Sequence, residues 1–150
     1  MPKIEMEITL PVGATQLSNE LLNMKGVNSE LWPYLKMTGP NNWYEKPIKE
    51  WPINQYLFRS KVLLFGILPV DIHRFKFDSV SNTGFKESSV SLLNSLWCHE
   101  RTVVSNRSNT TVKDAVYYQS RCGLLGVLIK PAYKLIFKHR HKRLKVKYAM

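Results

Sequence analysis

The sequence contains few of the features that mark specialised classes of protein. Its 150 residues include only 2 cysteines, Cys98 and Cys122, which are too few for a disulfide scaffold or a four-ligand zinc site. The 7 glycines and 8 prolines follow no period, which excludes collagen-like and low-complexity chains. No glycine-rich phosphate loop is present. Because 44% of the residues are hydrophobic, we expect residues 1–150 to form one globular domain.

Long apolar runs are also missing. Residues 1–7 alternate charged and apolar side chains and contain no apolar segment of a signal peptide. The most apolar stretch, residues 123–137, is interrupted by Lys130, Pro131 and Lys134, and it is shorter than the roughly 20 residues that span a bilayer. We therefore expect a soluble, cytoplasmic protein.

Acidic residues are absent from the C-terminal part of the chain. No Asp or Glu follows Asp114, whereas Lys and Arg recur from Arg121 onward. The formal net charge of +11 is therefore concentrated in the C-terminal segment and says little about the preceding residues.

The first quarter of the sequence predicts one strand and two short helices. Residues 3–10 alternate apolar and polar side chains, a pattern typical of a half-buried strand. Between residues 15 and 37 the apolar residues follow a helical period. Gly26 is a plausible end for the first helix, and Ser29 is a plausible start for the second.

The middle of the sequence predicts strands in consecutive antiparallel hairpins. After a loop at residues 38–42, apolar runs alternate with turn-rich segments every 8–12 residues or so. We expect strands within residues 48–51, 56–68, 71–80, 88–104 and 110–120.

The last segment, residues 124–148, returns to a helical period. On a helical wheel, the apolar side chains fall in one arc that includes Ile129, Tyr133, Ile136, Phe137 and Leu144. Lysines fall in the opposite arc and form what we call the lysine face: Lys130, Lys134, Lys138, Lys142 and Lys145. The pattern predicts a long amphipathic helix whose lysine face meets water.

These elements together predict an α+β architecture. An antiparallel sheet with one apolar face must cover that face, and only the C-terminal helix is long enough to do so. We expect a curved antiparallel sheet of about six to seven strands wrapped around this helix, with the two short helices after the first strand. Such an arrangement encloses a space in which small ligands bind.

Several motifs resemble those of one superfamily. F-G-x-x-P-x-x-x-H occupies residues 65–73, W-x-H residues 97–99 and T-x-x-x-D-x-V-x-Y residues 110–118; G-x-x-G and F-x-x-R follow at residues 123–126 and 137–140. In this order they resemble small bacterial ligand-binding members of the SRPBCC superfamily, which includes START lipid-transfer domains, polyketide cyclases and the birch pollen allergen. Arg121 and Cys122 stand where the family usually has a proline. The resemblance implies the helix-grip fold and a cavity, but no particular reaction.

Strand alternation predicts which side chains face the cavity. If Phe75, Trp97 and Val116 face inward, their strands turn polar residues inward as well. A His–Asp pair with a Tyr hydroxyl could serve acid–base chemistry, but a structural hydrogen-bond network is the interpretation we favour. The predicted cavity residues are His73, Phe75, Phe77, Trp97, His99, Asp114, Val116, Tyr118, Tyr133, Ile136, Phe137 and Arg140.

Arg140 has a separate prediction within this set. Because it lies between Ile136, Phe137 and Leu144, we expect its guanidinium at the interface of sheet and helix. A buried guanidinium needs a partner, which we expect to be a carboxylate, a strand-end carbonyl or the head group of an anionic ligand.

Other chemistries have little support in the sequence. Cys98 and His99 are neighbours on a strand and point to opposite faces. His139 and His141 lie about 200° apart around a helix and do not form a metal site. We assign no catalytic residue, no metal ligand and no cofactor.

Three functions remain open. The favoured one is binding of a hydrophobic or amphipathic small molecule, for carriage, sensing or storage. The alternative is an enzyme of the cyclase or dehydratase type that acts on a polyketide-like or aromatic substrate. In the third, the lysine face contacts a membrane surface or, least favoured, nucleic acid. The oligomeric state is left open.

Overall fold

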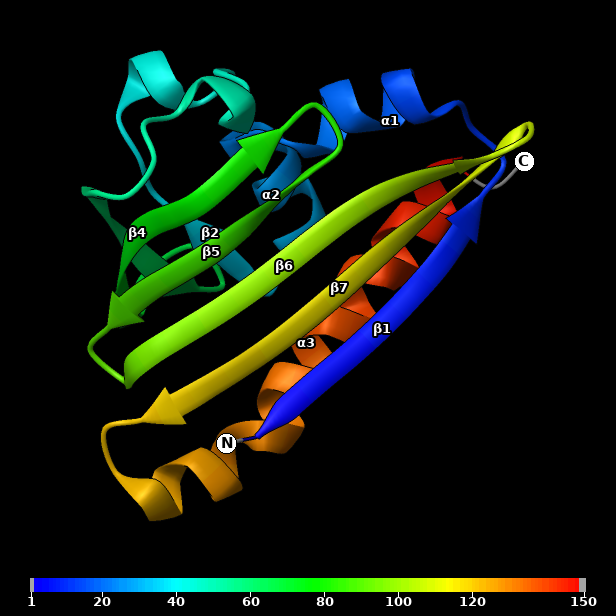
Figure 1. Cartoon of the computed structure of the whole chain (residues 1–150). Coiled ribbons are helices and arrows are strands. Elements are labelled where there is room, and N and C mark those ends of the chain that lie inside the picture. Colours follow the sequence, from blue (N-terminus) through cyan, green and yellow to red (C-terminus); the bar gives the residue numbers. More distant parts are fainter. Residues whose placement is uncertain (1, 149–150) are drawn as a thin grey trace.

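A curled antiparallel sheet surrounds one long helix in the computed structural model, which describes residues 2–148 (Figure 1). The seven strands lie in the order β1-β7-β6-β5-β4-β3-β2. Strands β2 to β7 each pair with the next strand in the sequence, whereas β1 pairs with β7. The strands are β1 (Lys3–Leu10), β2 (Leu35–Met37), β3 (Tyr56–Leu64), β4 (Leu68–Ser81), β5 (Gly84–Ser91), β6 (Asn94–Asn106) and β7 (Asn109–Ser120).

The helices lie on the concave side of the sheet. The long helix α3 (Gly123–Tyr148) runs along β1 and β7, and the short helices α1 (Ala14–Leu21) and α2 (Met24–Leu31) follow β1 and lie over the other end (Figure 1). Two 3-10 helices, η1 (Asn41–Trp43) and η2 (Ile48–Glu50), precede β3. The predicted α+β helix-grip architecture is confirmed.

Gly26 does not end a helix, contrary to the prediction. It lies inside α2, which begins earlier than Ser29 because the Asn23 side chain caps it by accepting a hydrogen bond from the Gly26 N–H at 2.7 Å. A Cβ atom on Gly26 would lie only 2.4 Å from the Glu20 carbonyl oxygen. The glycine is therefore required by the close approach of α1 and α2.

Residues 48–51 do not form a strand, also contrary to the prediction. They form η2, in which the Glu50 N–H donates to the Pro47 carbonyl, while the Ile48 N–H donates to the Leu22 carbonyl. Pro47 and Pro52 flank the segment and cannot donate to a strand ladder. The buried side chains of Ile48 and Trp51 pack with those of β4 and β5.

The predicted single strand at residues 88–104 is two strands, β5 and β6. The chain turns at Leu92 and Leu93, whose N–H groups donate to the Asp71 carboxylate at 2.9 and 3.3 Å. The turn contains no glycine or proline, so the residues that usually mark a turn in a sequence are missing there. The predicted strand at residues 56–68 is also interrupted, because β3 ends at Leu64 and β4 begins at Leu68. Residues 65–67 form a turn in which Phe65 and Gly66 have positive φ angles.

None of the helices within residues 2–148 has both the length and the apolar character that crossing a bilayer requires.

We expect Gly26→Ala to lower the free energy of unfolding by about 1–3 kcal/mol, because the added methyl group would press against backbone atoms of α1. Urea denaturation measures this change. Gly123→Ala is the matched control, since a Cβ atom at this other helical glycine meets no atom within 4 Å. A Gly26→Ala protein as stable as the wild type would show that α1 and α2 can move apart at little cost.

Candidate functional site

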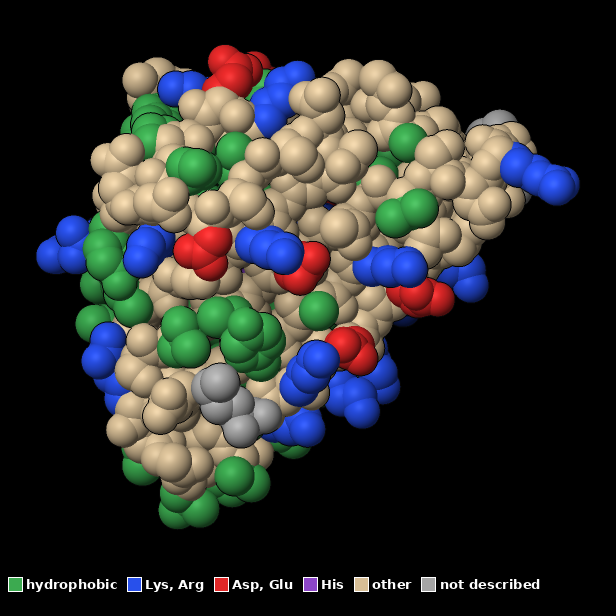
Figure 2. Space-filling view, viewed as in Figure 1, with side chains coloured by type: hydrophobic (Ala, Val, Ile, Leu, Met, Phe, Trp, Pro, Cys, Tyr) green, Lys and Arg blue, Asp and Glu red, His purple; other side chains and the backbone are tan. Residues whose placement is uncertain are grey.

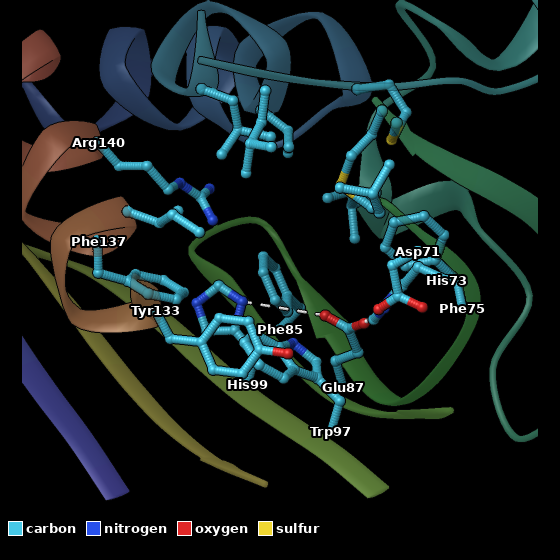
Figure 3. A pocket seen from close by; sticks show the side chains of 18 of the residues that line it. Asp71, His73, Phe75, Phe85, Glu87, Trp97, His99, Tyr133, Phe137 and Arg140 are labelled. Carbon is cyan, nitrogen blue, oxygen red and sulfur yellow. Dashed lines mark hydrogen bonds and ion pairs between the residues drawn. The ribbon is translucent and has the colours of Figure 1, made fainter. Parts of the chain in front are cut away.

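A mostly apolar cavity lies between the inner face of the sheet and helices α2 and α3 (Figure 3). Its empty volume is about 870 Å³, which includes the solvent-filled space at its mouth. Nine of the twelve predicted residues line it: His73, Phe75, Phe77, Trp97, His99, Tyr133, Ile136, Phe137 and Arg140.

The other three predicted residues are buried on the same side of the sheet but do not line the cavity. Asp114, Val116 and Tyr118 all lie on β7, which α3 covers. The Tyr118 hydroxyl donates to the Gly126 carbonyl at 2.8 Å and therefore joins strand to helix. This hydroxyl and the His99–Asp114 pair therefore make separate hydrogen bonds, and an acid–base role for the tyrosine stays a prediction.

The structure adds polar residues to the cavity wall that the sequence reading missed. Asp71, Glu87 and Asn94 line it, together with apolar side chains of α2 and β2. Glu87 was missed because the strand was expected to begin at Ser88. Strand alternation from the apolar Phe85 places Glu87 on the same face, and this spacing is the signal that would have revealed it.

Arg101 is the centre of the buried polar network. Its guanidinium donates to both oxygens of Asp114 at 2.8 and 2.9 Å and to both oxygens of Glu30 at 2.8 and 2.7 Å. Arg101 is only 1% exposed, and Glu30 is fully buried. Burial raises the pKa of Glu30, but the Arg101 and Arg140 cations outweigh it and hold this pKa below its ordinary value.

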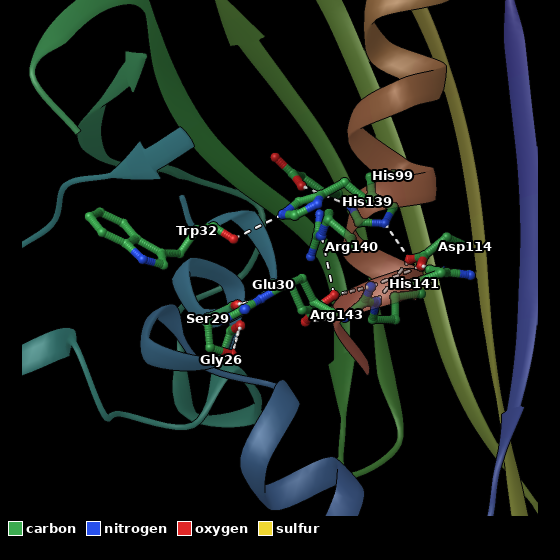
Figure 4. Close-up of polar contacts among 12 residues, drawn as sticks. Gly26, Ser29, Glu30, Trp32, His99, Asp114, His139, Arg140, His141 and Arg143 are labelled. Atoms are coloured by element: carbon green, nitrogen blue, oxygen red, sulfur yellow. Dashed lines mark hydrogen bonds and ion pairs between the residues drawn. The ribbon is translucent and has the colours of Figure 1, made fainter. Parts of the chain in front are cut away.

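Asp114 binds two histidines as well as Arg101 (Figure 4). The Nε2 atoms of His99 and His141 each lie 2.7 Å from one of its oxygens. Burial raises the pKa of Asp114, yet the Arg101 cation and these hydrogen bonds hold it well below its ordinary value. The predicted His99–Asp114 pair is therefore present, with a carboxylate whose acceptor positions are already occupied.

Arg140 connects this network to the cavity. Its Nε donates to Glu30 at 3.2 Å, so the predicted carboxylate partner exists. Its terminal nitrogens make no hydrogen bond to any residue of the range 2–148, and the guanidinium points from α3 toward the cavity (Figure 3). The side chain is 8% exposed, so a ligand in the cavity can reach a guanidinium that bulk water barely reaches.

His73 and Glu87 form a second buried hydrogen-bonded pair, on the opposite side of the cavity from Arg140 (Figure 3). Burial raises the pKa of Glu87, but His73 outweighs it and holds this pKa below its ordinary value. The other Glu87 oxygen lies 3.9 Å from His99 Nδ1, which links this pair to the Arg101 network. A histidine and a carboxylate at the cavity wall are groups able to exchange a proton with a bound molecule.

No group of three His, Cys, Asp or Glu side chains is arranged to hold a metal ion within residues 2–148.

The comparisons with known proteins agree on the fold. A family model with the description "Domain of unknown function (DUF8410)" matches residues 8–148. Protein CV1439 from Chromobacterium violaceum superposes with a TM-score of 0.71 at 8% identity, covering 100% of this chain and 99% of the other. No curated protein matches the sequence.

Two further solved structures connect this fold to named proteins. A START superfamily protein from Mycobacterium smegmatis has a TM-score of 0.67 at 11% identity, with 97% and 96% of the two chains covered. Ara h 8.0201 has a TM-score of 0.56 at 13% identity, with coverages of 94% and 95%. At these identities the similarity establishes the helix-grip fold and nothing finer.

We expect Arg101→Leu to lower the free energy of unfolding by about 3–5 kcal/mol, because it leaves two buried carboxylates without their cation. Chemical denaturation measures the loss. Arg59→Leu, at an exposed position on β3, is the control and should change stability little. Equal stability of the two variants would contradict the central position of Arg101.

Stability should also fall in acid. Because Glu30, Glu87 and Asp114 have lowered pKa values in the folded protein, their contribution is complete above their ordinary values of 4.5 for Glu and 3.8 for Asp. This contribution is lost as the pH falls through the lower folded values. Urea denaturation from about pH 7 to about pH 3 should show a decline below about pH 5. Glu87→Gln should make the decline shallower, and an unchanged slope would exclude Glu87 as a contributor.

Proposed function

The chain belongs to the family described as Domain of unknown function (DUF8410), with the SRPBCC helix-grip fold, and we propose that it binds a hydrophobic or amphipathic small molecule in its cavity. The role is carriage, sensing or storage. The observation that carries this proposal is the cavity itself, an apolar space between sheet and helices with a few polar groups on its wall. A cytoplasmic location stays a prediction.

The wall chemistry favours a largely apolar ligand. Trp51, Phe75 and Phe77 pack edge-to-face or stacked against one another with ring centroids 5.4–5.9 Å apart, which gives a rigid aromatic surface. Each buried methylene contributes about 0.8 kcal/mol, so about ten buried carbons give roughly 8 kcal/mol before the costs of association. Micromolar binding needs about 8 kcal/mol after these costs, so polar contacts must add to the apolar burial.

Arg140 favours an anionic head group on that ligand. Its terminal nitrogens face the cavity while Glu30 holds its Nε, so the planar guanidinium is oriented before the ligand arrives. A carboxylate fits such a guanidinium in the bidentate geometry that carboxylates and arginine adopt. Glu30 itself is also held by Arg101, so Arg140 retains charge that Glu30 does not fully compensate.

The second candidate is an enzyme of the cyclase or dehydratase type on a polyketide-like or aromatic substrate. The observation that favours it is the His73–Glu87 pair at the cavity wall, opposite Arg140. In such a reaction the pair would move a proton and Arg140 would stabilise negative charge on an oxygen. We rank it second because Glu87 also contacts His99 and thereby forms part of the structural network.

Native mass spectrometry of the purified protein tests ligand binding directly by detecting a co-purified molecule. Displacement of an environment-sensitive naphthalene probe by decanoate then measures affinity. We expect Val62→Phe, which places a larger side chain in the cavity wall, to weaken decanoate at least tenfold while the melting temperature stays near that of the wild type. Absence of both a co-purified molecule and probe uptake would exclude the cavity as a ligand site.

Arg140→Met tests the head-group preference. We expect it to weaken decanoate at least tenfold more than methyl decanoate, because only decanoate presents a carboxylate to the guanidinium. Lys130→Met, at an exposed position on the same helix, is the control and should affect neither ligand. If Arg140→Met weakens both ligands equally, or lowers only the melting temperature, Arg140 is a structural brace.

A further inference from the structure

We propose that a surface groove beside the cavity docks on the surface of an anionic lipid bilayer. The groove lies between α3 and the segment that joins α2 to β2. Three of its lining residues, Leu31, Leu35 and Ile136, also line the cavity, so they form the wall between the two spaces. Docking can be measured without any cavity ligand and is therefore independent of the proposed ligand-binding function.

The most exposed large apolar side chains of the β3–β4 turn lie next to this groove. Phe65, Ile67 and Leu68 are 59%, 82% and 56% exposed. The Phe65 ring lies 6.4 Å from the ring of Tyr34, a groove residue, and the Phe65 N–H donates to the Tyr34 carbonyl. The turn thus holds bulky apolar groups in water at the rim of an apolar groove.

Contacts with α3 make this region one continuous surface. The His139 ring lies 4.7 Å from the Tyr34 ring, and His139 Nε2 donates to the Trp32 carbonyl at 2.9 Å (Figure 4). The Trp32 side chain lies against Gly66 of the β3–β4 turn and is itself 51% exposed. The turn, the α2–β2 connection and α3 therefore fix one another, and their exposed apolar groups keep a defined arrangement.

The outer face of α3 extends the apolar surface. Leu124, Leu128 and Leu135 are 69%, 67% and 64% exposed and lie within about 40° of one another around the helix. The lysines of the lysine face are exposed, as expected, and these leucines lie beside the lysine face around the helix. The helical wheel assigned side chains to the buried arc and to the lysine face, but it assigned these three leucines to neither.

The charge around the groove complements an anionic bilayer. Lys138 and Lys142 line the groove, its lining contains no carboxylate, and no acidic residue follows Asp114 in the chain. The outer face of the sheet differs, since Lys and Arg alternate there with Asp and Glu (Figure 2). Exposed apolar side chains beside a basic face are the pattern of proteins that lie in the interface of an anionic membrane.

The same charge argues against a second copy of the chain as the occupant. A two-fold interface through this surface places the same patch on both subunits. Lys138 and Lys142 would then face a patch that also offers lysines and no carboxylate. A bilayer containing anionic lipid accepts both the lysines and the apolar side chains.

Co-sedimentation with vesicles tests the proposal. We expect the wild type to bind phosphatidylcholine vesicles that contain phosphatidylserine at least tenfold more tightly than pure phosphatidylcholine vesicles. The double variant Ile67→Ser/Leu135→Ser should lose at least tenfold of that affinity. Ile53→Ser is the control, because Ile53 is 44% exposed and precedes Asn54, whose N–H donates to the Phe77 carbonyl far along β4 from the β3–β4 turn.

The same assay tests whether the lysines of the groove cause the preference for anionic lipid. Lys138→Glu/Lys142→Glu should abolish the preference for phosphatidylserine, whereas Lys86→Glu, at an exposed position on β5, should retain it. Circular dichroism melting checks that each variant is folded. Binding without a preference for phosphatidylserine, or equal binding by the apolar variant and its control, overturns the proposal.

Sedimentation equilibrium tests whether a second copy of the chain occupies the surface instead of a bilayer. A wild-type dimer that Ile67→Ser/Leu135→Ser dissociates would assign the surface to a second copy of the chain and overturn docking on a bilayer. A monomer whose vesicle binding follows the expected pattern supports it. Decanoate binding by the wild type without vesicles is measured independently, so failure of the cavity function and failure of docking are distinguishable.

Discussion

The buried guanidinium of Arg101 is the interaction on which the arrangement of the cavity depends. It reaches from β6 to Asp114 on the neighbouring strand β7 and to Glu30 on α2, which comes from a distant part of the sequence. Both carboxylates need this cation because no water can solvate them. Glu30 in turn holds Arg140 of α3. One side chain thereby fixes a sheet, a short helix and the long helix relative to one another.

A continuous polar seam results along one wall of an otherwise apolar space. It runs from His73 through Glu87 and His99 to Asp114, and through Arg101 to Glu30 and Arg140. Its ends at His73 and Arg140 line the cavity, whereas Arg101 and Asp114 do not. Those buried members position the groups that a ligand can touch. A rigid wall with two accessible polar ends suits recognition of an amphipathic molecule.

The parts of the site that were predictable follow from strand and helix periodicity. Alternation along β4 and β6 placed His73, Phe75, Trp97 and His99 on the inner face, and the helical wheel placed Phe137 toward the sheet. Glu87 was missed because its strand was expected to begin at Ser88. The division between β5 and β6 was missed because the Asp71 carboxylate that stabilises the turn at Leu92 and Leu93 comes from another strand. No local pattern reveals such a partner.

The sequence by itself determined the fold class, the inward faces of β4, β6 and α3 and the basic C-terminal helix, because these follow from side-chain period and charge along the chain. It did not determine that Glu30 of α2 meets Arg101 and Arg140, since this contact joins residues separated by 71 and 110 positions. Nor did it decide that the exposed turn at Phe65 lies beside Tyr34 and α3. Only tertiary packing brings these segments together, because the free energy of a buried ion pair or an apolar surface depends on neighbours in space.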